Sequence, residues 1–433
     1  MKPQLTISED SLTLEIYGGY GEIGGNCVLV KDRDRKIVFD NGIRFQVLRK
    51  YYRGRIQPLG INELRSIGAI PPLNIFEDID AIYISHFHLD HLGLLGALPP
   101  GVKVYVPSID ILEVIEDWYR RSSTWLAEIP HRLNIKIEEF SAYHMDEHGV
   151  IPIPVSHSAY PSYAFLYEGY SKTLFYSGDL RVDSPLRSRI DTLSNIERAI
   201  DSMNLDIALL EATNIGGIET PIGSEEFRNI MNRILMENIL VIISIDPLDY
   251  ELFTAISELA LLSGRTITIA SPRIIDVLPK WLKTSNTNNI DLSRIAIAIE
   301  LEKPTTVPLQ YVGLKQDVFR TPENFLLIQE PVSFLEMLRQ MRLWGEELPR
   351  NAIAILTTPE PLETELEVEE KTLITWLYTL GIQIYRARFS GHYYPHELRN
   401  IVDILKPKKL IPIHTKHPRL VYTVVQQMLE QSR

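Results

Sequence analysis

The segment His86-Phe87-His88-Leu89-Asp90-His91 constrains what this chain can fold into more than any other part of the sequence. It follows the apolar run Ala81–Ser85, which predicts a β-strand, and it marks a strand-to-helix junction. His86 and His88 can point to one side of an extended backbone, whereas Asp90 and His91 open the next turn and face a second point nearby. Imidazole and carboxylate groups together suit zinc, and less selectively manganese or iron. The segment therefore predicts a metal site at a strand end.

Four ligands in this arrangement cannot complete two metal sites, so further ligands have to come from elsewhere in the chain. Three candidates follow apolar runs that predict strands: His157 after Val150–Val155, Asp179 after Thr173–Tyr176, and His414 after Leu410–Ile413. Taken singly, each of them is more often a hydrogen-bonded structural group. Together they lie at strand ends, where the loops of a layered α/β fold gather to form sites.

Composition indicates a folded, soluble chain, because 45% of its 433 residues are hydrophobic and 23% are charged. At about 150 residues per domain, this length favours two domains over three. The net charge is −12, which argues against a surface that is basic throughout. Any contact with nucleic acid therefore has to be local.

Cysteine usage and apolar runs indicate the cellular compartment. Cys27 is the single cysteine, so no internal disulfide can form, which is typical of an intracellular protein. The best candidate for a membrane span, Ile239–Ile245, is far shorter than the roughly 18 residues required. The segment Met1–Ser11 lacks the pattern of a signal peptide. We expect a cytoplasmic protein that does not contact a membrane.

Short apolar runs bounded by turn residues predict mostly strands in the first half of the chain. Besides the runs already named, they are Leu12–Tyr17, Cys27–Val30, Lys36–Phe39, Lys103–Val106 and Ala164–Tyr167. A helix is expected over Ile109–Arg121, with Ser108 as its N-cap. From about Asn214, helical patterns such as Tyr250–Leu262 alternate with apolar strands such as Thr266–Ala270. This alternation is typical of βαβ units and predicts a second domain around a parallel sheet.

The run Gly19-Tyr20-Gly21-Glu22-Ile23-Gly24 matches the dinucleotide-binding pattern G-x-G-x-x-G, and Asp40 follows at about the distance of a ribose-binding acid. A dinucleotide fingerprint has to open a helix, however, whereas the residues after this run, Asn26–Val30, form a β-type pattern. The run is therefore predicted to be a glycine-rich turn between two strands.

The order of the candidate ligands resembles the metallo-β-lactamase superfamily, whose motifs run Asp, H-x-H-x-D-H, His, Asp and His along one chain. The corresponding residues are Asp40, His86, His88, Asp90, His91, His157, Asp179 and His414. The resemblance implies an αββα sandwich that holds two zinc ions per chain. One zinc would bind His86, His88 and His157, the other would bind Asp90, His91 and His414, and Asp179 would bridge them. Asp40 would orient the cluster without binding metal.

A narrower resemblance is to the β-CASP nucleases, and among them to ribonuclease J and its archaeal relatives. The residues that carry it are Gly18–Asn26, Glu211 in Leu209–Asn214, His392 in Phe389–His392, and His414 in Ile411–Thr415. This branch inserts an α/β domain between the motifs of Asp179 and His414. The resemblance thus implies a discontinuous catalytic domain of residues 1–213 and 375–433, and an inserted β-CASP domain of residues 214–374.

Two departures from ribonuclease J bear on its further properties. The segment Thr357–Glu365 occupies the place where relatives carry a Ser- and Gly-rich segment that contacts phosphate. The chain also ends soon after His414, without the extra C-terminal domain of bacterial ribonuclease J. The direction of cutting and the oligomeric state, including a homodimer, therefore stay open.

The resemblance implies a zinc-dependent ribonuclease. Two zinc ions about 3.5–4 Å apart can share a hydroxide, lower its pKa and offset charge on the scissile phosphate. Asp90 and Asp179 would take part as metal ligands, while His392, held by Glu211, would assist the leaving oxygen. Without the resemblance, Glu211 and His392 would be interpreted as a loop carboxylate and a surface histidine.

RNA is the expected partner, and one basic segment is the candidate surface for it. Arg44, Arg49, Lys50, Arg53 and Arg55 lie close together, interleaved with Phe45, Tyr51 and Tyr52. Such a stretch offers phosphate contacts and stacking faces together. The alternative is a solvated loop whose charges balance nearby acids. Ser390 and Gly391, which precede His392, are the other expected RNA contacts.

Three other functions stay open. A thioesterase or lactonase of the same superfamily would use the same zinc ions at an acyl carbon, but the long insertion disfavours it. A DNA-directed β-CASP nuclease is a further alternative, since nothing in the sequence reports on the 2′-hydroxyl. A catalytically silent RNA-binding subunit is disfavoured because no ligand is missing. Endonuclease and 5′-to-3′ exonuclease action both fit the motifs.

Overall fold

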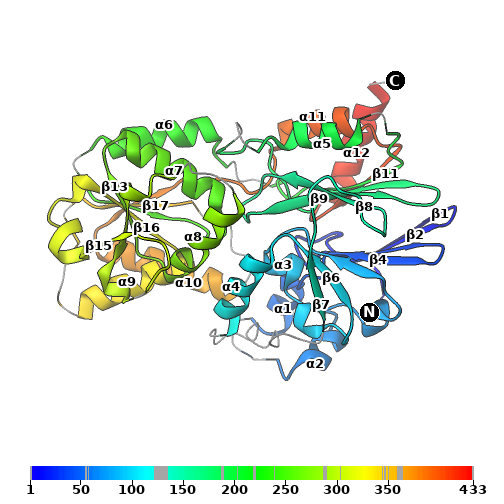
Figure 1. Ribbon diagram of the computed structural model, residues 1–433, viewed down its shortest axis with the longest axis horizontal. Helices are drawn as coiled ribbons and strands as arrows, with labels where there is room; N and C mark the ends of the chain where they lie inside the picture. The colour runs from blue at the N-terminus through cyan, green and yellow to red at the C-terminus, as the bar shows by residue number, and fades with distance from the viewer. Residues whose placement is uncertain are drawn as a thin grey trace. The chain divides into compact units, whose positions relative to one another are not determined.

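The computed structural model describes residues 2–53, 56, 58–120, 135–186, 190–201, 203–217, 221–237, 239–285, 290–302, 304–343, 345, 348–349, 351–357 and 364–431. The chain divides into two compact units. The first comprises Met1–Glu219 together with Gly391–Arg433, and the second comprises Thr220–Ser390. The colours of Figure 1 follow this order: the chain leaves the first unit once and returns to it at its C-terminal end.

The first unit contains a seven-stranded sheet in the order β1-β2-β3-β4-β5-β6-β7. Its strands are β1 (Leu5–Glu9), β2 (Leu12–Gly18), β3 (Cys27–Asp32), β4 (Arg35–Phe39), β5 (Ala81–Tyr83), β6 (Lys103–Val106) and β7 (Lys136–Glu139). Strands β1 to β4 pair antiparallel, and β4 to β7 pair parallel. Strand β2 shows how the sequence specifies the sheet, since Leu12, Leu14 and Ile16 are buried while Thr13 and Glu15 between them are partly exposed.

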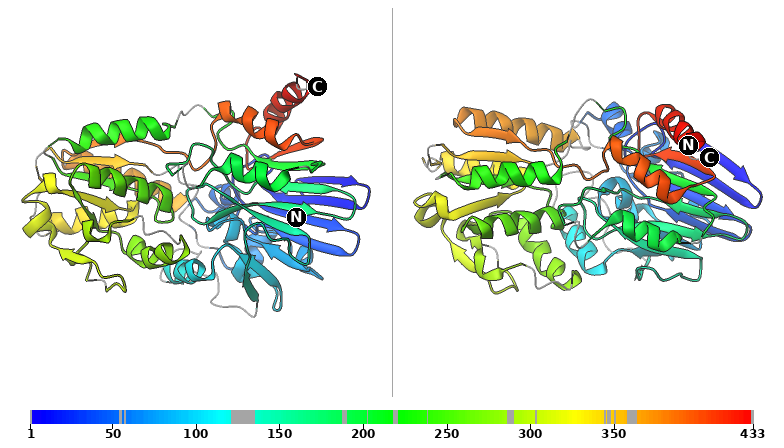
Figure 2. Two further views of the ribbon diagram at one scale, coloured as in Figure 1. Left: turned by 45° about the horizontal axis from the view of Figure 1, so that its top comes forward. Right: turned by 90° about the horizontal axis from the view of Figure 1, so that it is seen from above.

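A second, five-stranded sheet of the same unit has the order β19-β11-β10-β9-β8. Its strands are β8 (Val150–Val155), β9 (Ser162–Glu168), β10 (Thr173–Tyr176), β11 (Ile207–Glu211) and β19 (Lys409–Ile413). Strand β19, from the C-terminal segment, pairs parallel with β11 and aligns Ile413 with Glu211. Both views of Figure 2 show the red C-terminal segment beside the blue-to-green N-terminal part, with which it completes one unit.

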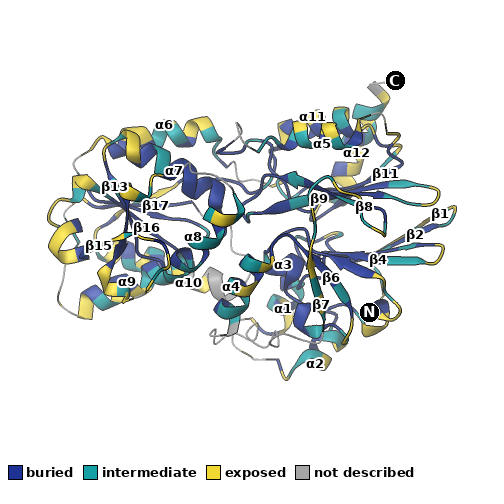
Figure 3. Cartoon of the chain, in the orientation of Figure 1, coloured by how far each residue is buried: buried dark blue, intermediate teal, exposed yellow. Residues whose placement is uncertain are grey.

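Aromatic side chains from both sheets form the core of the sandwich. The Phe39 ring stacks on Phe165 and Tyr176 at centroid distances of 5.4 and 5.1 Å, and Tyr83 packs edge-on against Phe165. These residues belong to a buried cluster that draws on both sheets. Figure 3 shows the result, since the inner strands are coloured as buried along most of their length.

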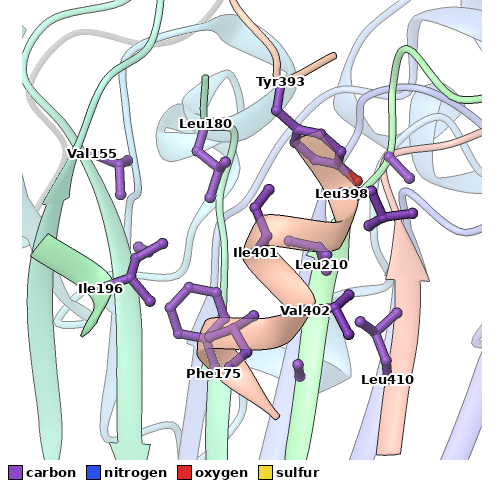
Figure 4. Packing of buried hydrophobic residues seen from close by; sticks show 14 of the residues in the cluster. Val155, Phe175, Leu180, Ile196, Leu210, Tyr393, Leu398, Ile401, Val402 and Leu410 are labelled. Atoms are coloured by element: carbon purple, nitrogen blue, oxygen red, sulfur yellow. The ribbon is translucent and has the colours of Figure 1, made fainter. Parts of the chain in front are cut away.

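Helices cover the outer faces of the two sheets (Figure 1). On one side lie α5 (Thr192–Ile200), α11 (Leu398–Leu405) and α12 (Pro418–Gln431), and on the other lie α1 (Phe45–Tyr51), α2 (Ile61–Ser66), α3 (Leu89–Leu92) and α4 (Ile109–Arg120). Short 3₁₀ turns occur at Leu73–Phe76, Leu95–Ala97 and Pro395–Glu397. Figure 4 shows Leu398, Ile401 and Val402 of α11 facing Phe175 and Leu410 of the sheet below. The predicted αββα sandwich is confirmed.

The inserted unit is built around an all-parallel sheet in the order β15-β14-β13-β16-β12-β17-β18. The strands are β12 (Val241–Ser244), β13 (Thr266–Ile269), β14 (Ile295–Ala298), β15 (Gln310–Val312), β16 (Phe325–Gln329), β17 (Ile353–Leu356) and β18 (Gln383–Arg386). The helices are α6 (Ser224–Leu235), α7 (Tyr250–Leu262), α8 (Pro272–Thr284), α9 (Pro331–Leu343) and α10 (Thr364–Thr379), with short turns at Leu292–Arg294, Ile299–Leu301, Leu314–Val318 and Pro322–Asn324. The predicted α/β insertion is confirmed.

The boundaries of the two units differ from the predicted ones. The inserted unit ends at Ser390, whereas the sequence placed the return at residue 375. That position lies inside α10, and the strand that follows, β18, pairs parallel with β17 at the edge of the inserted sheet. Strand pairing between segments far apart in sequence set this boundary, so local patterns did not reveal it.

Local sequence patterns predicted the glycine-rich turn but did not predict the strand β1. The glycine-rich run after β2 leads into the antiparallel strand β3 and not into a helix, so the predicted turn is confirmed. The strand β1 was not predicted, because its residues alternate between partly buried and exposed positions at a sheet edge. Among the helices that the structure describes, none combines the length and apolar character that crossing a bilayer requires.

Candidate metal centre

The predicted metal ligands all lie in the first unit, at the carboxyl ends of its strands. His86 and His88 follow β5, while Asp90 and His91 lie in the short helix α3. His157, Asp179 and His414 follow β8, β10 and β19. Because β10, β11 and β19 run parallel as neighbours, their carboxyl ends meet at one edge of the sheet. The structure therefore brings together residues from four separate segments of the chain.

The side chains at this edge form four overlapping groups of potential donor atoms, and two of these groups match the predicted ligand sets. His86, His88 and His157 make one group, and Asp90, His91 and His414 make the other, with the donor atoms of each group within 4.8 Å of one another. His157 Nε2 lies 3.1 Å from His88 Nδ1, and His414 Nε2 lies 3.1 Å from Asp90 Oδ2. These are the two sets of side chains that the resemblance implied.

Asp179 lies between the two groups. Its Oδ2 atom is 3.1 Å from His91 Nε2 and 3.6 Å from His414 Nε2, both in the second group. The same atom is 3.8 Å from His86 Nε2 and 3.9 Å from His157 Nε2 in the first group. A single carboxylate can thus reach metal ions held by either group.

Unpaired polar atoms in the centre indicate that the donor set fits a metal. His86 Nε2 and Asp179 Oδ1 are buried and have no hydrogen-bond partner among the residues that the structure describes. A buried polar atom without a partner costs free energy, and a metal ion would remove that cost. Imidazole nitrogens and carboxylate oxygens are the donors that zinc accepts in tetrahedral sites. The residues present therefore fit one or more divalent ions of this kind.

Electrostatic shifts hold two of the donors, His86 and Asp179, in the form that binds metal. Burial lowers the pKa of His86 well below its ordinary value, and the neighbouring His91 and His157 lower it further, so the His86 ring is neutral. Burial raises the pKa of Asp179, but His414 and His91 outweigh that effect and keep the pKa well below its usual range. Neutral imidazole and ionised carboxylate are the ligand forms of these groups.

A hydrogen-bond network behind His91 orients its ring. His91 Nδ1 lies 2.7 Å from Asp40 Oδ2, and since a carboxylate only accepts, the ring donates from Nδ1 and presents Nε2 to the centre. Asp40 is fully buried and also accepts from Ser85 Oγ at 2.8 Å and Tyr176 OH at 2.5 Å. The Tyr176 oxygen in turn accepts from Asn26 Nδ2 at 3.2 Å.

Sequence reasoning missed Tyr176, Ser85 and Asn26. Tyr176 belongs to a predicted apolar strand, where a tyrosine ordinarily packs in the core, and its hydroxyl reaches Asp40 from the facing sheet. One signal was present: Tyr176 is three residues before Asp179, so the end of its strand had to lie close to the centre. Contacts across the two sheets, however, depend on tertiary packing alone.

Glu211 and His392 form a pair beside the donor groups. His392 Nδ1 lies 3.1 Å from Glu211 Oε1, and Glu211 is fully buried while 16% of the His392 side chain is exposed. The His392 ring is 5.2 Å from that of His157 and 5.5 Å from that of His414. Asp179, His392 and His414 also satisfy the spacing of a metal-binding group. The position of His392 is therefore compatible with two roles, that of a proton donor and that of a metal ligand.

The glycine-rich turn after β2 packs directly on the centre. A side chain at Gly24 would place its Cβ 2.6 Å from Asp90 Oδ2, and Gly24 has a φ of +79°. Tyr20 and Glu22 of the same turn form backbone bridges with Thr415, next to His414. The turn was predicted, but its contacts with Asp90 and Thr415 were not.

The residues of the basic segment have different surroundings in the structure, and the RNA surface that they would form stays a prediction. Arg44 Nε donates to Glu22 Oε1 at 2.6 Å and Nη1 to Gly68 O at 2.7 Å, so this side chain stabilises the fold of the turn. Arg49 and Lys50 lie in the last turn of α1, where Lys50 Nζ is 5.5 Å from the ring of the exposed Tyr51. Arg53, which has a positive φ, follows this helix, and Arg55 lies outside the described residues.

Gly391 contacts a metal-site histidine, and its contact with RNA stays a prediction. His157 Nδ1 donates to the Gly391 carbonyl oxygen at 2.6 Å, which turns Nε2 toward the centre. A Cβ at Gly391 would lie 3.0 Å from His157 Cε1, so the close approach requires glycine.

Ser390 is the last residue of the inserted unit. Of the segment Thr357–Glu365, residues 358–363 lie outside the described residues.

The chain is similar to several known proteins, in sequence and in fold. Residues 62–219 match the model of a β-lactamase superfamily domain. The chain is 24% identical over 422 residues to ribonuclease J of Mycoplasma genitalium, which covers 92% of this chain and 67% of that protein. It is 24% identical over 441 residues to ribonuclease J of Pyrococcus abyssi, covering 96% and 92%. A solved structure of a protein of unknown function from Enterococcus faecalis shares the fold, with a TM-score of 0.72, 18% identity and 95% coverage of each chain.

Proposed function

This chain belongs to the metallo-β-lactamase superfamily and resembles ribonuclease J of the β-CASP branch, and on that premise we propose that it is a zinc-dependent ribonuclease. The observation that carries the proposal is the position of Asp179 Oδ2, between two groups of donor atoms and beside the Glu211–His392 pair. The named relatives support RNA as substrate, because their similarity extends over more than nine-tenths of this chain.

We assign two zinc ions to the centre. His86, His88 and His157 would hold one, Asp90, His91 and His414 the other, and Asp179 would reach both. When bound, the ions would lower the pKa of water toward neutrality and stabilise charge on the phosphate oxygens. The protein's own contribution is to hold the donors in place: Asp40 orients His91, and Gly391 orients His157.

His392 is proposed as the group that protonates the leaving oxygen. Glu211 holds its ring through Nδ1, and the exposed part of the ring gives a substrate access to it. Asn214 Nδ2 donates to the carbonyl oxygens of His392 and Tyr393, which fixes the backbone at this point. A histidine held in this way can transfer a proton to the departing oxygen and so accelerate cleavage by about 10²–10⁴-fold.

One experiment tests the function and its mode. Purified protein is incubated with zinc and single-stranded RNA labelled at its 5′ or 3′ end, with a 5′-monophosphate or a 5′-triphosphate. Internal products from both labels would establish endonuclease action, and mononucleotides from the 5′ end would establish 5′-to-3′ exonuclease action. DNA of the same sequence and an acyl thioester serve as comparison substrates. Turnover of the thioester without cleavage of RNA would refute the proposal, and equal cleavage of DNA would widen it.

A further inference from the structure

We propose that the Thr213 hydroxyl is a positioning group that selects the ring state of His414 and joins it to the Glu211–His392 pair. The inference deepens the proposed function and rests on it for the assignment of His414 as a metal ligand. Thr213 lies two residues beyond β11, and His414 directly follows β19. Since Glu211 and Ile413 are paired in register, the two residues leave the sheet side by side.

The Thr213 hydroxyl lies between a carboxylate and an imidazole. Its Oγ1 atom is 2.8 Å from Glu211 Oε2 and 2.8 Å from His414 Nδ1. The Thr213 backbone N–H also donates to Glu211 Oε2, at 2.9 Å. The two shortest contacts of the hydroxyl are therefore with groups of the centre, while a third, to the His414 carbonyl oxygen, is longer at 3.2 Å. The Thr213 side chain is itself half-buried.

The hydroxyl carries one hydrogen, which decides the direction of both bonds. The buried Glu211 carboxylate only accepts, so Thr213 donates its hydrogen to Glu211 Oε2. The second neighbour, His414 Nδ1, then has to donate to Thr213 Oγ1. A bond in the opposite direction would leave two lone pairs facing each other at 2.8 Å between Thr213 and Glu211.

This direction determines which nitrogen of His414 is available. When the His414 ring is neutral, a hydrogen on Nδ1 leaves Nε2 unprotonated, 3.1 Å from Asp90 Oδ2 and 3.6 Å from Asp179 Oδ2. Without the Thr213 hydroxyl, the competing tautomer can form, in which Nε2–H donates to Asp90. In that tautomer, the Nε2 hydrogen points to the place where His414 and Asp90 would share a metal ion. The tautomer therefore opposes metal binding.

One carboxylate thus serves two functional side chains. Glu211 Oε1 contacts His392, while Oε2 contacts Thr213 and, through it, His414. Without the hydroxyl, Glu211 Oε2 keeps the hydrogen bond from the Thr213 N–H but loses the one from Oγ1. The carboxylate is then held less firmly, and so is His392, which contacts its other oxygen. We therefore expect the substitution to weaken the second metal site and to slow cleavage even when zinc is saturating.

The test compares Thr213→Val, which keeps the shape, with Thr213→Ser, which keeps the hydroxyl. Zinc affinity is measured by competition with a chelator, on full-length protein and without RNA. Thr213→Val should bind one zinc ion as the wild type does and the other about 10–100-fold more weakly, the usual effect of losing a group that supports a ligand. Thr213→Ser should retain wild-type affinity. Thr254→Val, which removes a buried hydroxyl that donates to Tyr250 O in the inserted unit, should leave both zinc sites unchanged.

The outcomes separate this inference from the proposed function. If Thr213→Val, and likewise Thr213→Ala, binds both zinc ions with wild-type affinity, the inference is wrong, whether or not the protein cuts RNA. A weakened second site in protein that does not cleave RNA would retain the inference and refute the function. Equal loss in Thr213→Ser and Thr213→Val would also overturn the inference, since shape and not the hydroxyl would then matter.

Discussion

His414 Nε2 lies 3.1 Å from Asp90 Oδ2, although 324 positions of the sequence separate the two residues. The contact arises because β19 adds to the sheet beside β11 and brings the C-terminal segment back to the N-terminal unit. Neither residue could complete a metal site with its sequence neighbours alone. The return of the chain after the inserted unit is thus a requirement of the proposed chemistry.

Metal content is the first prediction. We expect about two zinc ions per chain in protein purified without added metal, because the seven predicted ligands all lie in the donor groups of the centre and one tetrahedral site uses only four ligands. Elemental analysis by mass spectrometry measures the ratio. A value near zero, or strictly one, would remove the proposed two-ion centre.

Replacing His392 with Ala should separate catalysis from metal binding. The rate of RNA cleavage should fall by about 10²–10⁴-fold while zinc content stays at the wild-type level, because His392 is assigned to the leaving oxygen. His88→Ala should lose both zinc and activity, since it removes a donor of the first group. The exposed His396, which stacks on Tyr394, supplies the matched control, and His396→Ala should resemble the wild type. Loss of zinc from His392→Ala would make His392 a ligand.

The Tyr176 hydroxyl should support the metal centre through Asp40. Tyr176→Phe removes the hydrogen bond to Asp40, so His91 is less firmly oriented and zinc affinity should fall, by about 10-fold or more. Tyr167→Phe is the matched control, because the buried Tyr167 hydroxyl donates to Asp32, a carboxylate outside the donor groups. Chelator competition measures both variants. Equal zinc affinity in the two variants would show that Tyr176 acts only in folding.

The glycine turn offers a steric test with its own control. Gly24→Ala would place a Cβ 2.6 Å from Asp90 Oδ2, so Asp90 has to move and the second zinc site should weaken. Gly21 has a similar φ of +78° but no atom within 4 Å of the added Cβ. Gly21→Ala should therefore show only the cost of a left-handed backbone, about 1 kcal/mol in the free energy of unfolding, with zinc affinity intact. Unfolding by denaturant and chelator competition distinguish the two. Intact zinc binding in Gly24→Ala would mean that the turn adapts without moving Asp90.

Local sequence patterns determined much of the fold and the set of candidate donors. Apolar runs such as Lys103–Val106 and Thr173–Tyr176 coincide with strands β6 and β10, because alternation and β-branched residues act over a few neighbouring positions. The spacing within His86–His91 places four donors near one point for the same local reason. The order of the motifs along the chain then indicated the sandwich and its insertion.

Tertiary structure alone decided how these residues combine. Strand order brought His414 to Asp90, and the facing sheet brought the Tyr176 hydroxyl to Asp40. The same packing directed Arg44 to Glu22 and not outward, although the sequence placed it in a basic stretch. A hydrogen bond depends on distances of about 3 Å between atoms, and residues far apart in sequence reach such distances only through the order and packing of strands. The sequence therefore determined which chemical groups the centre could use, and the packing of two sheets determined which of them meet.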